Sequence, residues 1–439
     1  MKKMGGEEGR QGEGAKGPNA YSLSPHLPVS LSHLIDDRRS WDVIVIGSGP
    51  AGAMAAYELA RRSLRVLLVD KSAFPRAKVC GCCLNGQALA LLQARGLGHV
   101  IKNQRAVPLH RAVLAASGHR AVFPLPTGVA LSREALDMGL VAAAVESGAN
   151  FLPGTTATLS EASSFCRKVI LRSDEVEVEA EAAVVLAADG LGGRLSQTRK
   201  ASGACERPGS DGQTSSNFWI RPGRLHAPLA IRLRTRKDSR IGAAVITEDG
   251  PSFYQPGTIY MACGTGGYVG LVRLEDDRLN IAAAFDPRAL KGARHAGRLA
   301  TRILNEACLP PLPNLTDLHW KGTPSLTHHA SSMADERLFI LGDAASFVEP
   351  CTGEGITWAL RAAVAVAPLA ERAVWAWNPS FKAQWTATFD REVARRQIIC
   401  RLTAAALRRP RLIACAVRLL ALLPSLSGPV LRQLNTAQF

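Results

Sequence analysis

No apolar run in the sequence reaches the roughly 18 to 20 residues of a membrane-spanning helix, so we predict no such helix. The ten cysteines are too few and too irregularly spaced for a disulfide scaffold, and they indicate reduced thiols in a cytoplasmic setting. The polar, Gly-rich start contains no apolar core, so we expect no secretory signal and interpret residues 1–38 as a disordered tail. What remains is a globular chain of 439 residues, 47% hydrophobic, long enough for two or more structural units.

Basic residues outnumber acidic ones, and half of the net charge of +16 lies near the C-terminus. Residues 382–439 contain ten Lys or Arg and two acidic residues, a net charge of +8. The arginines alternate with apolar runs such as LIACAVRLLALL and lack interleaved aromatics for base stacking, which argues against a nucleic-acid partner. Two alternatives stay open: helices that cap a substrate domain, or helices that contact an anionic membrane through Arg401, Arg408, Arg409, Arg411, Arg418 and Arg432.

The segment WDVIVIGSGPAGAMAAYELARRSLRVLLVDK has the pattern of a complete βαβ unit. A short apolar strand runs into Gly47, Gly49 and Gly52, and an Ala-rich helix and a second strand follow. The glycines allow a tight turn, a close approach to a diphosphate, and close packing of the helix on the strand. Asp70 ends the second strand, 21 residues after Gly49, where its carboxylate can accept hydrogen bonds from a ribose. The unit predicts a dinucleotide cofactor without distinguishing FAD from NAD.

Three later segments add to this pattern. VVLAADGLGGRLS is an apolar strand that ends in Asp189 and Gly190, and LSREALDMGLVAAAVESGANF is a helix that opens with Ser132 and Arg133. ERLFILGDAASFVEPCTGEGITWALRAAVAVAPLA is a strand that ends in Asp343, followed by a Gly-rich turn and a long Ala-rich helix. Together with FPRAKVCG, which follows the βαβ unit, these motifs resemble the flavoprotein superfamily of para-hydroxybenzoate hydroxylase, and more closely its geranylgeranyl reductase-like branch. The resemblance covers roughly residues 41–369.

The resemblance implies an α/β fold that binds FAD. It predicts a Rossmann-type, glutathione-reductase-like FAD-binding domain, an antiparallel β-sheet substrate domain and a C-terminal helical unit. We expect the FAD-binding domain in three parts, residues 39–107, 128–200 and 323–378, with a substrate-domain insertion at 108–127. The substrate-binding sheet is expected at residues 201–322, where short alternating strands are separated by Gly and Asp turns. The basic helical unit is expected at residues 379–439.

The resemblance also implies roles for individual residues. Asp343 would bind the ribityl chain, Arg133 would lie near the diphosphate, and the turn at residues 353–356 would lie along the isoalloxazine. A helix that begins near Gly355 can direct its positive end at the flavin N1, where reduced flavin accumulates negative charge. The full set of predicted FAD contacts is Gly47, Gly49, Pro50, Ala51, Gly52, Asp70, Lys71, Arg76, Cys80, Gly81, Arg133, Asp189, Gly190, Gly342, Asp343, Pro350, Gly353, Glu354, Gly355 and Ile356.

Three cysteines within CGCC, at positions 80, 82 and 83, suggest a metal site or a redox disulfide. The adjacent Cys82 and Cys83 are a poor geometry for one tetrahedral ion, and no second CxxC or His pair follows, so we predict no metal. By the resemblance, Cys80 lines the flavin and substrate pocket. We interpret Cys82 and Cys83 as small packing residues, with a dithiol as the alternative. Cys351 is a further candidate, because we expect the turn that contains it to contact the isoalloxazine; the alternative is that its thiol is a small apolar filler.

The sequence predicts a single dinucleotide site. GTGGYVG could be mistaken for a second one, but Val269 occupies the position of the third required glycine. A single site excludes the two-site architecture of disulfide reductases. NAD(P)H would therefore bind transiently or be replaced by another electron donor.

Three chemistries share the implied scaffold: reduction of an isoprenoid or polyketide alkene, oxygenation of an aromatic or lipophilic substrate, and halogenation. Reduction ranks first, with Cys80, Lys78 and Tyr260 as the candidate catalytic residues. The aromatic and Pro pattern that lines the geranylgeranyl pocket in that branch is missing here, so the substrate is specified only as a hydrophobic small molecule. Halogenation ranks last. The single Trp-x-Trp, at Trp375 and Trp377, lacks the expected isoleucine and follows the GD segment, so we interpret it as an interfacial aromatic pair.

Further expectations concern the histidines and the setting of the protein. His328 and His329 are expected in loop or packing roles rather than as a base. We expect a cytoplasmic protein that contacts the inner face of the membrane if its C-terminal helices bind anionic lipid. The sequence leaves the oligomeric state open.

Overall fold

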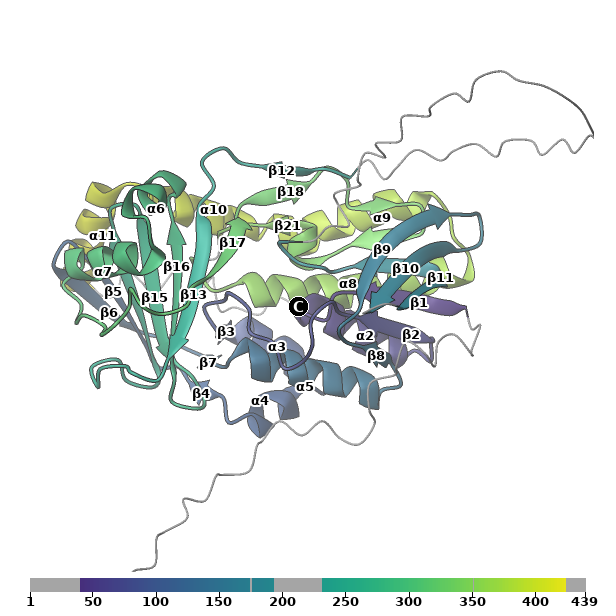
Figure 1. Ribbon diagram of the computed structural model, residues 1–439, viewed down its shortest axis with the longest axis horizontal. Helices are drawn as coiled ribbons and strands as arrows, with labels where there is room; N and C mark the ends of the chain where they lie inside the picture. The colour runs from purple at the N-terminus through teal and green to yellow at the C-terminus, as the bar shows by residue number, and fades with distance from the viewer. Residues whose placement is uncertain (1–39, 174–175, 193–230, 350, 424–439) are drawn as a thin grey trace, which may run out of the picture.

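The computed structural model of the protein describes residues 40–173, 176–192, 231–349 and 351–423. The tail predicted at residues 1–38, the predicted FAD contact Pro350 and the predicted membrane contact Arg432 lie outside these residues. Figure 1 shows two units side by side, one built on the N-terminal βαβ segment and one on a second large sheet. Together with the helices described below, they confirm the predicted α/β class.

The first unit is built on an eight-stranded sheet. Its strands are β1 (Trp41–Ile46), β2 (Val66–Val69), β8 (Asn150–Leu152), β9 (Thr156–Ala162), β10 (Arg167–Ser173), β11 (Val176–Ala187), β19 (Ala334–Asp335) and β20 (Leu338–Ile340). The main path runs β19-β20-β11-β1-β2-β8, and all pairs from β20 to β8 are parallel. Residues 43–46 and 66–69 are all buried, which explains why these strands are continuous apolar runs instead of alternating patterns.

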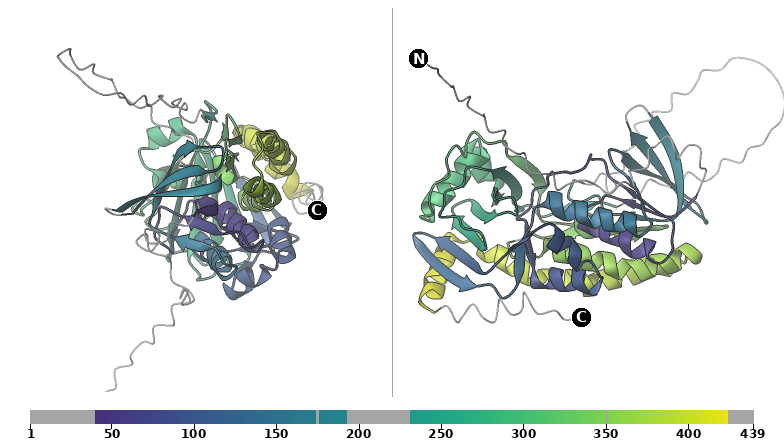
Figure 2. Two further views of the ribbon diagram at one scale, coloured as in Figure 1. Left: turned by 90° about the vertical axis from the view of Figure 1, so that its right-hand side faces the viewer. Right: turned by 90° about the horizontal axis from the view of Figure 1, so that it is seen from below.

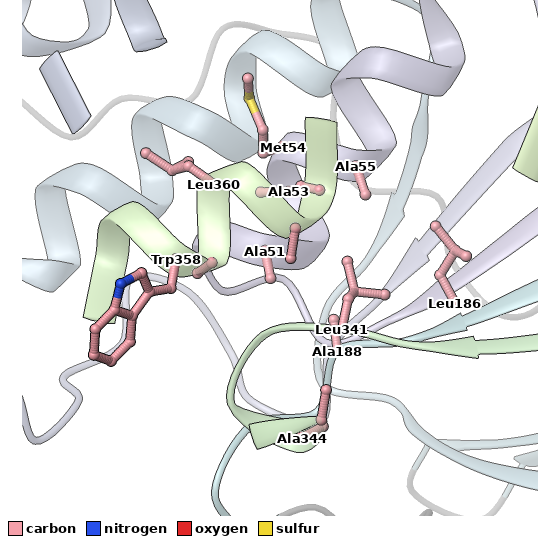
Figure 3. Packing of buried hydrophobic residues seen from close by; sticks show 14 of the residues in the cluster. Ala51, Ala53, Met54, Ala55, Leu186, Ala188, Leu341, Ala344, Trp358 and Leu360 are labelled. Carbon is pink, nitrogen blue, oxygen red and sulfur yellow. The ribbon is translucent and has the colours of Figure 1, made fainter. Parts of the chain in front are cut away.

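Ala-rich helices cover this sheet. They include α2 (Pro50–Ala60), α5 (Arg133–Glu146) and α8 (Gly355–Trp375), and the smaller α3 (Gly86–Ala94) and α4 (Gly98–Asn103) lie beside them. Every residue of α2 is buried, because α2 packs between the sheet and the helices α5 and α8. Figure 3 shows alanines of α2 beside α8, close to Ala188, Leu341 and Ala344 at the strand ends. Because these side chains are small, the backbones of α2, α8 and the strand ends lie close to one another.

The second unit is a seven-stranded sheet of order β17-β13-β16-β15-β14-β5-β6. These strands are β5 (Arg111–Ala116), β6 (His119–Pro124), β13 (Ile241–Thr247), β14 (Thr258–Gly264), β15 (Gly267–Arg273), β16 (Leu279–Phe285) and β17 (Lys321–Ser325). All pairs are antiparallel except β14 with β5, so the predicted antiparallel sheet contains one parallel pair. GTGGYVG forms the turn between β14 and β15 and the start of β15.

The two faces of the seven-stranded sheet pack differently. Residues such as Tyr260, Val269 and Ile281 pack with α7 (Ala296–Glu306), which the sequence analysis did not predict and which lies beside α6 (Pro287–Ala293). The alternate residues Cys263 and Tyr268 belong to the core that continues into the first unit. The sheet therefore has one face toward its own helices and one face toward the first unit.

Two small sheets join the units. One consists of β3 (Cys83–Asn85), β7 (Gly128–Ala130) and β4 (Val107–Pro108), and the other of β12 (Leu233–Thr235), β18 (His328–Ala330) and β21 (Ser346–Phe347). Both lie at crossings of the chain between the first unit and the seven-stranded sheet (Figure 1). They place the residues around Cys80 and Asp343 at the junction.

The C-terminal helices bridge both units. They are α9 (Ser380–Phe389), a π-helical segment (Asp390–Ala394), α10 (Gln397–Ala406) and α11 (Pro410–Leu422), and Figure 2 shows them along one side of the molecule. Trp385 of α9 is fully buried and donates a hydrogen bond to the Ile340 carbonyl at 2.9 Å. The buried Ile413 and Val417 lie on the face of α11 that packs against β5 and β6. Among the described residues, no helix is long and apolar enough to cross a membrane.

Trp375 and Trp377, which the sequence predicts as an interfacial aromatic pair at the end of α8, lie in different surroundings. Trp377 packs against Phe339 and Phe381, with ring centroids 5.6 and 6.0 Å apart. Trp375, the last residue of α8, is 79% exposed. Only Trp377 therefore has an interfacial packing role.

Candidate functional site

The loop between β1 and α2 requires glycine at two positions. Gly47 has φ of +97°, and a Cβ there would lie 2.3 Å from the carbonyl oxygen of Ala188, just beyond the end of β11. A Cβ on Gly52 would lie 1.8 Å from the carbonyl oxygen of Gly47. Both positions thus exclude any side chain, and they hold the start of α2 tightly against two strand ends.

The N-terminus of α2 faces two arginines. A Cβ on Gly49 would lie 3.5 Å from Nη2 of Arg133 and 3.8 Å from Nη2 of Arg76. The first turn of α2 contains no acidic residue. Its N-cap residue, Gly49, has no side chain that could accept a hydrogen bond from the backbone N–H groups of this turn. The positive end of the helix dipole and two guanidinium groups therefore meet at one place, which is the donor set that suits a diphosphate.

A buried carboxylate holds these arginines. Asp137 is fully buried, and it accepts hydrogen bonds from Nε and Nη2 of Arg133 at 2.9 and 2.8 Å. Its Oδ2 also lies 3.4 Å from Nη1 of Arg76. Asp137 was not among the residues predicted from the sequence. The i,i+4 spacing from Arg133 was a visible signal, but such pairs are usually exposed on a helix surface.

The predicted ribose contact, Asp70, is already engaged by the protein. Its carboxylate accepts hydrogen bonds from the Ser48 backbone at 2.9 Å, the Ser48 hydroxyl at 2.8 Å and the Ser72 backbone at 2.9 Å. Arg76 lies 3.2 Å away. Burial would raise the pKa of Asp70, but Arg76 and these hydrogen bonds together hold it below its usual value. The side chain therefore stays ionised and fixed in the loop.

The GD segment lies against the first turn of α2. Gly342 has φ of +62°, and a Cβ there would lie 2.7 Å from the Cβ of Ala51. Asp343 follows, and burial raises its pKa to about 6, although Arg133 nearby opposes this shift. Nε2 of His328 lies 2.8 Å from the Asp343 carbonyl oxygen. His328 therefore positions the GD backbone from strand β18, whereas the sequence suggested a loop or packing role.

The Gly-rich turn before α8 is tied to its neighbours by hydroxyl groups. Thr352 donates a hydrogen bond to Oε2 of Glu354 at 3.0 Å, and Thr357 donates to Oδ1 of Asn85 at 2.8 Å, which links α8 to α3. Glu354 is 5% exposed, and burial raises its pKa to about 7. Gly355 is the first residue of α8, as predicted from the sequence.

The three thiols of the CGCC segment, those of Cys80, Cys82 and Cys83, lie in different surroundings. Cys80 is half-buried, and its Sγ accepts a hydrogen bond from the Cys82 backbone at 3.3 Å. Hydrogen bonding from Cys82 lowers the pKa of Cys80 to about 6, against the effect of burial and with a further contribution from Arg133. Cys82 is buried among apolar side chains, and the thiol of Cys83 donates to the Gly81 carbonyl at 3.2 Å. Cys80 is the thiol that the structure brings to Arg133 and Asp343.

The second sheet meets this group through Asn280 of β16. Its Nδ2 donates a hydrogen bond to the Cys80 carbonyl at 3.1 Å, and the residue is 2% exposed. Asn280 was not predicted from the sequence, because Cys80 lies 200 positions away and no local pattern connects the two residues. The bond fixes the CGCC segment to the sheet face that is turned toward the first unit.

Small and apolar residues follow one another across this face of the sheet. Ala244, Ala282, Gly270 and Met261 are paired in register on neighbouring strands, and all but Ala244 are half-exposed. Tyr268 lies on the same face, where its ring packs 5.4 Å from the Arg240 guanidinium. This row is the apolar surface that the seven-stranded sheet presents beside Cys80.

The remaining predicted residues fall into two groups. Asp189 and Gly190 follow β11, and a Cβ on Gly47 would lie 2.9 Å from the Asp189 Cα, so they lie beside the loop. Tyr260 is not brought to the group. Its hydroxyl donates to the Phe253 carbonyl at 2.7 Å, and its ring packs in the core toward α7. Lys71 and Lys78 are exposed, but Lys78 lies close enough to Asp343 that its charge opposes the rise in the pKa of that carboxyl.

The side chains present fit FAD. Within the described part of the chain, Nε of the buried Arg76 has no hydrogen-bond partner and Nη1 has none beyond its ion pair with Asp137, although the residue lies beside the open N-terminus of α2. Arg133, Asp343 and Cys80 lie close enough to one another to shift each other's pKa values. An anionic diphosphate would use the arginine donors, and a polyhydroxyl chain would use the carboxylate of Asp343.

Comparison with known proteins gives the same assignment. Residues 40–373 match the family described as FAD binding domain. The chain is 26% identical over 365 residues to conditioned medium factor receptor 1 of Dictyostelium discoideum, covering 77% of this chain and 64% of that protein, less than two thirds of its length. It is 29% identical over 355 residues to menaquinone reductase of Mycobacterium tuberculosis, covering 74% of this chain and 75% of that protein.

Solved structures share the fold at low identity. A geranylgeranyl bacteriochlorophyll reductase-like protein from Thermoplasma acidophilum superposes with a TM-score of 0.68 at 16% identity, covering 87% of this chain and 92% of that chain. A flavin-dependent brominase superposes with a TM-score of 0.68, also at 16% identity, covering 90% and 94%. At this identity the likeness shows the fold, and it does not choose between the chemistries. The family match covers most of the chain, however, and the chain therefore belongs to the FAD binding domain family of FAD-dependent oxidoreductases, with FAD as its cofactor.

Proposed function

We propose that this protein is a reductase that saturates a carbon–carbon double bond in a hydrophobic substrate. Bound FAD, once reduced, supplies the hydride, and NAD(P)H binding transiently is the proposed source of electrons. The observation that carries the proposal is the apolar row of Ala244, Ala282, Gly270 and Met261 beside Cys80. A face of small apolar side chains suits an extended hydrocarbon and offers little to a polar aromatic ring.

Cys80 is the proposed proton donor. Saturation of a double bond needs one proton in addition to the hydride, and a donor works best when its pKa lies near the working pH. The pKa of Cys80, lowered to about 6 by hydrogen bonding from Cys82 and by Arg133, meets this condition. Asn280 holds the Cys80 carbonyl, so the thiol has a fixed position relative to the sheet.

The relatives support a hydrophobic substrate. Menaquinone reductase is named for a lipid-soluble quinone, and the reductase-like neighbour is named for a geranylgeranyl compound. The brominase neighbour is named for halogenation and favours that alternative. Reduction is distinguished from oxygenation by the requirement for oxygen, and from halogenation by the requirement for a halide.

The deciding experiment uses the holoenzyme under anaerobic conditions. The flavin is reduced chemically, a geranylgeranyl compound without a quinone ring is added, so that its double bonds are the groups that reduced flavin can reduce, and flavin absorbance and product mass are followed. We expect the flavin to reoxidise without oxygen and the product to gain two hydrogens. Reoxidation that requires oxygen, with a hydroxylated aromatic product, would assign the monooxygenase function instead, and product formation that depends on bromide would assign halogenation.

We infer that α10 and α11 contact an anionic membrane. Of the eleven large hydrophobic residues exposed in the described chain, six lie on or directly after these two helices: Ile398, Leu402, Leu412, Leu419, Leu422 and Leu423. Arg411 and Arg418 are exposed beside them, which suits anionic headgroups. A contact there would place the apolar substrate close to the enzyme.

The structure determines how this contact is tested. Deleting the helices would remove the buried Cys400, Ile413 and Val417, so substitutions of exposed residues are the cleaner choice. The double variant Leu412→Gln/Leu419→Gln should lose at least half of its sedimentation with anionic liposomes at low salt. Exposed Phe165, in the β9–β10 hairpin, serves as the control in Phe165→Gln. Absence of wild-type binding at low salt would refute the contact.

A further inference from the structure

Two buried thiols from distant parts of the chain lie side by side. Sγ of Cys351, in the Gly-rich turn, is 3.9 Å from Sγ of Cys400, in α10, 49 positions later in the sequence. Cys351 is 8% exposed and Cys400 is fully buried. A change in side-chain rotamer could bring sulfurs at this separation within bonding distance.

Ion pairs hold the two segments in place. Glu349, two residues before Cys351, is fully buried and lies 2.8 Å from Arg240 Nη1 and 3.0 Å from Arg408 Nη2. Arg240 also donates a hydrogen bond to the Leu407 carbonyl at 2.9 Å, just after α10. The turn and the end of α10 are therefore fixed to the same charged group, which keeps the two sulfurs together.

Further contacts orient the thiols. The thiol of Cys400 donates to the Glu349 carbonyl at 3.0 Å, and the Thr352 hydroxyl oxygen lies 3.4 Å from the Cys400 sulfur. The neighbouring Gly353 is half-exposed, and a Cβ there would meet no atom of the described residues within 4 Å. A small oxidant can thus approach Cys351 from the side of the turn, although the pair itself is packed in the core.

We propose that Cys351 and Cys400 form a reversible disulfide that locks α10 onto the turn before α8. With hydrogen peroxide as the oxidant, one sulfur is first oxidised to a sulfenic acid with release of water, and the second thiol then displaces a second water. Two thiols and one peroxide thus give one disulfide and two waters, and a dithiol reductant reverses the step.

The lock acts on the border of the FAD site. Thr352, which contacts Cys400, also donates to Glu354 at the start of α8. In the reduced protein, α10 is held to this turn by noncovalent contacts alone, and in the oxidised protein it is held by a covalent bond. The disulfide therefore adds a covalent bond between α10 and the turn before α8, and it does so whichever reaction the site performs.

The test compares reduced and peroxide-treated full-length holoprotein. After alkylation of free thiols and digestion, we expect a peptide that links Cys351 to Cys400 and disappears on reduction. We also expect a Tm about 5 °C higher after oxidation, because the bond closes a loop of 49 residues in the unfolded chain. Cys400→Ala should lose both the linked peptide and the rise in Tm.

Cys415→Ser is the matched control, because Cys415 is an exposed thiol on the adjacent α11, and this variant should retain both effects. If Cys400→Ala does not fold, Cys351→Ala provides the same comparison, and peptide mapping of the wild type decides on its own. Oxidation that links other cysteines while Cys351 and Cys400 remain alkylated would overturn the proposal. So would a linked peptide with no rise in Tm, because α10 would then not be locked.

Discussion

Arg133 and Asp137, one turn apart on α5, form a bidentate ion pair with hydrogen bonds of 2.9 and 2.8 Å, and the carboxylate is fully buried. Asp137 also lies 3.4 Å from Arg76, so one carboxylate holds both guanidinium groups that face the N-terminus of α2. The positive charge proposed to bind the FAD diphosphate therefore depends on a residue that we expect to make no contact with the cofactor.

Asp137→Asn should lower the free energy of unfolding by about 3 kcal/mol, because it leaves the guanidinium of Arg133 without its paired carboxylate and leaves Arg76 with Asp70 alone. Urea unfolding measures this. Asp238→Asn is the matched control, since Asp238 forms a similar bidentate pair with Arg236 at 3.0 and 3.1 Å but on the surface. Its loss should cost less than about 1 kcal/mol. Equal costs for the two variants would contradict the role of Asp137.

Asp343→Ala should weaken FAD binding about tenfold, because it removes the carboxylate proposed to accept hydrogen bonds from the ribityl chain. Titration of apoprotein with FAD, followed by flavin fluorescence, measures the dissociation constant. Asp317→Ala, at an exposed position before β17, should bind FAD as the wild type does. An Asp343→Ala protein with intact fold and unchanged affinity would remove Asp343 from the site.

Cys80→Ser should keep its bound flavin and lose at least tenfold in turnover, because a serine hydroxyl is a much weaker acid than a thiol with a pKa of about 6. The pH dependence of Cys80 alkylation in the wild type should show an inflection near 6. In Arg133→Gln the inflection should move upward, because Arg133 contributes to lowering this pKa. Cys83→Ser is the control, and equal turnover in both serine variants would argue against a proton donor at Cys80.

Glu354→Gln should stabilise the protein at pH 8 and have little effect near pH 4. Burial raises the pKa of Glu354 from 4.5 to about 7, so the folded state keeps a proton that the unfolded state has released between these values. The stability of the wild type therefore falls as the pH rises through this window and stays lower above it, by about 3 kcal/mol. Thermal unfolding from pH 4 to pH 8 measures the difference, and parallel pH profiles for the two proteins would disprove it.

The family, the α/β class and the cofactor follow from local sequence. The turn after the first strand contains Gly47, Gly49 and Gly52, and a Cβ at Gly47 or Gly52 would have no space. This requirement for glycine can be predicted from residue type and spacing alone. The starts of α5 and α8 were likewise predicted at Arg133 and Gly355, and the structure begins both helices there. The roles of the individual FAD contacts remain predictions.

Tertiary structure decided which side chains meet. Tyr260 and Met261 are neighbours in sequence but lie on opposite faces of the sheet, so the predicted Tyr260 packs toward α7 and Tyr268 lies on the face toward the first unit. Asn280 and Cys80 meet across 200 residues, and Cys351 and Cys400 across 49. The sequence determines the elements through short-range backbone and periodicity rules, whereas contacts between distant segments depend on how the two sheets and the C-terminal helices pack together.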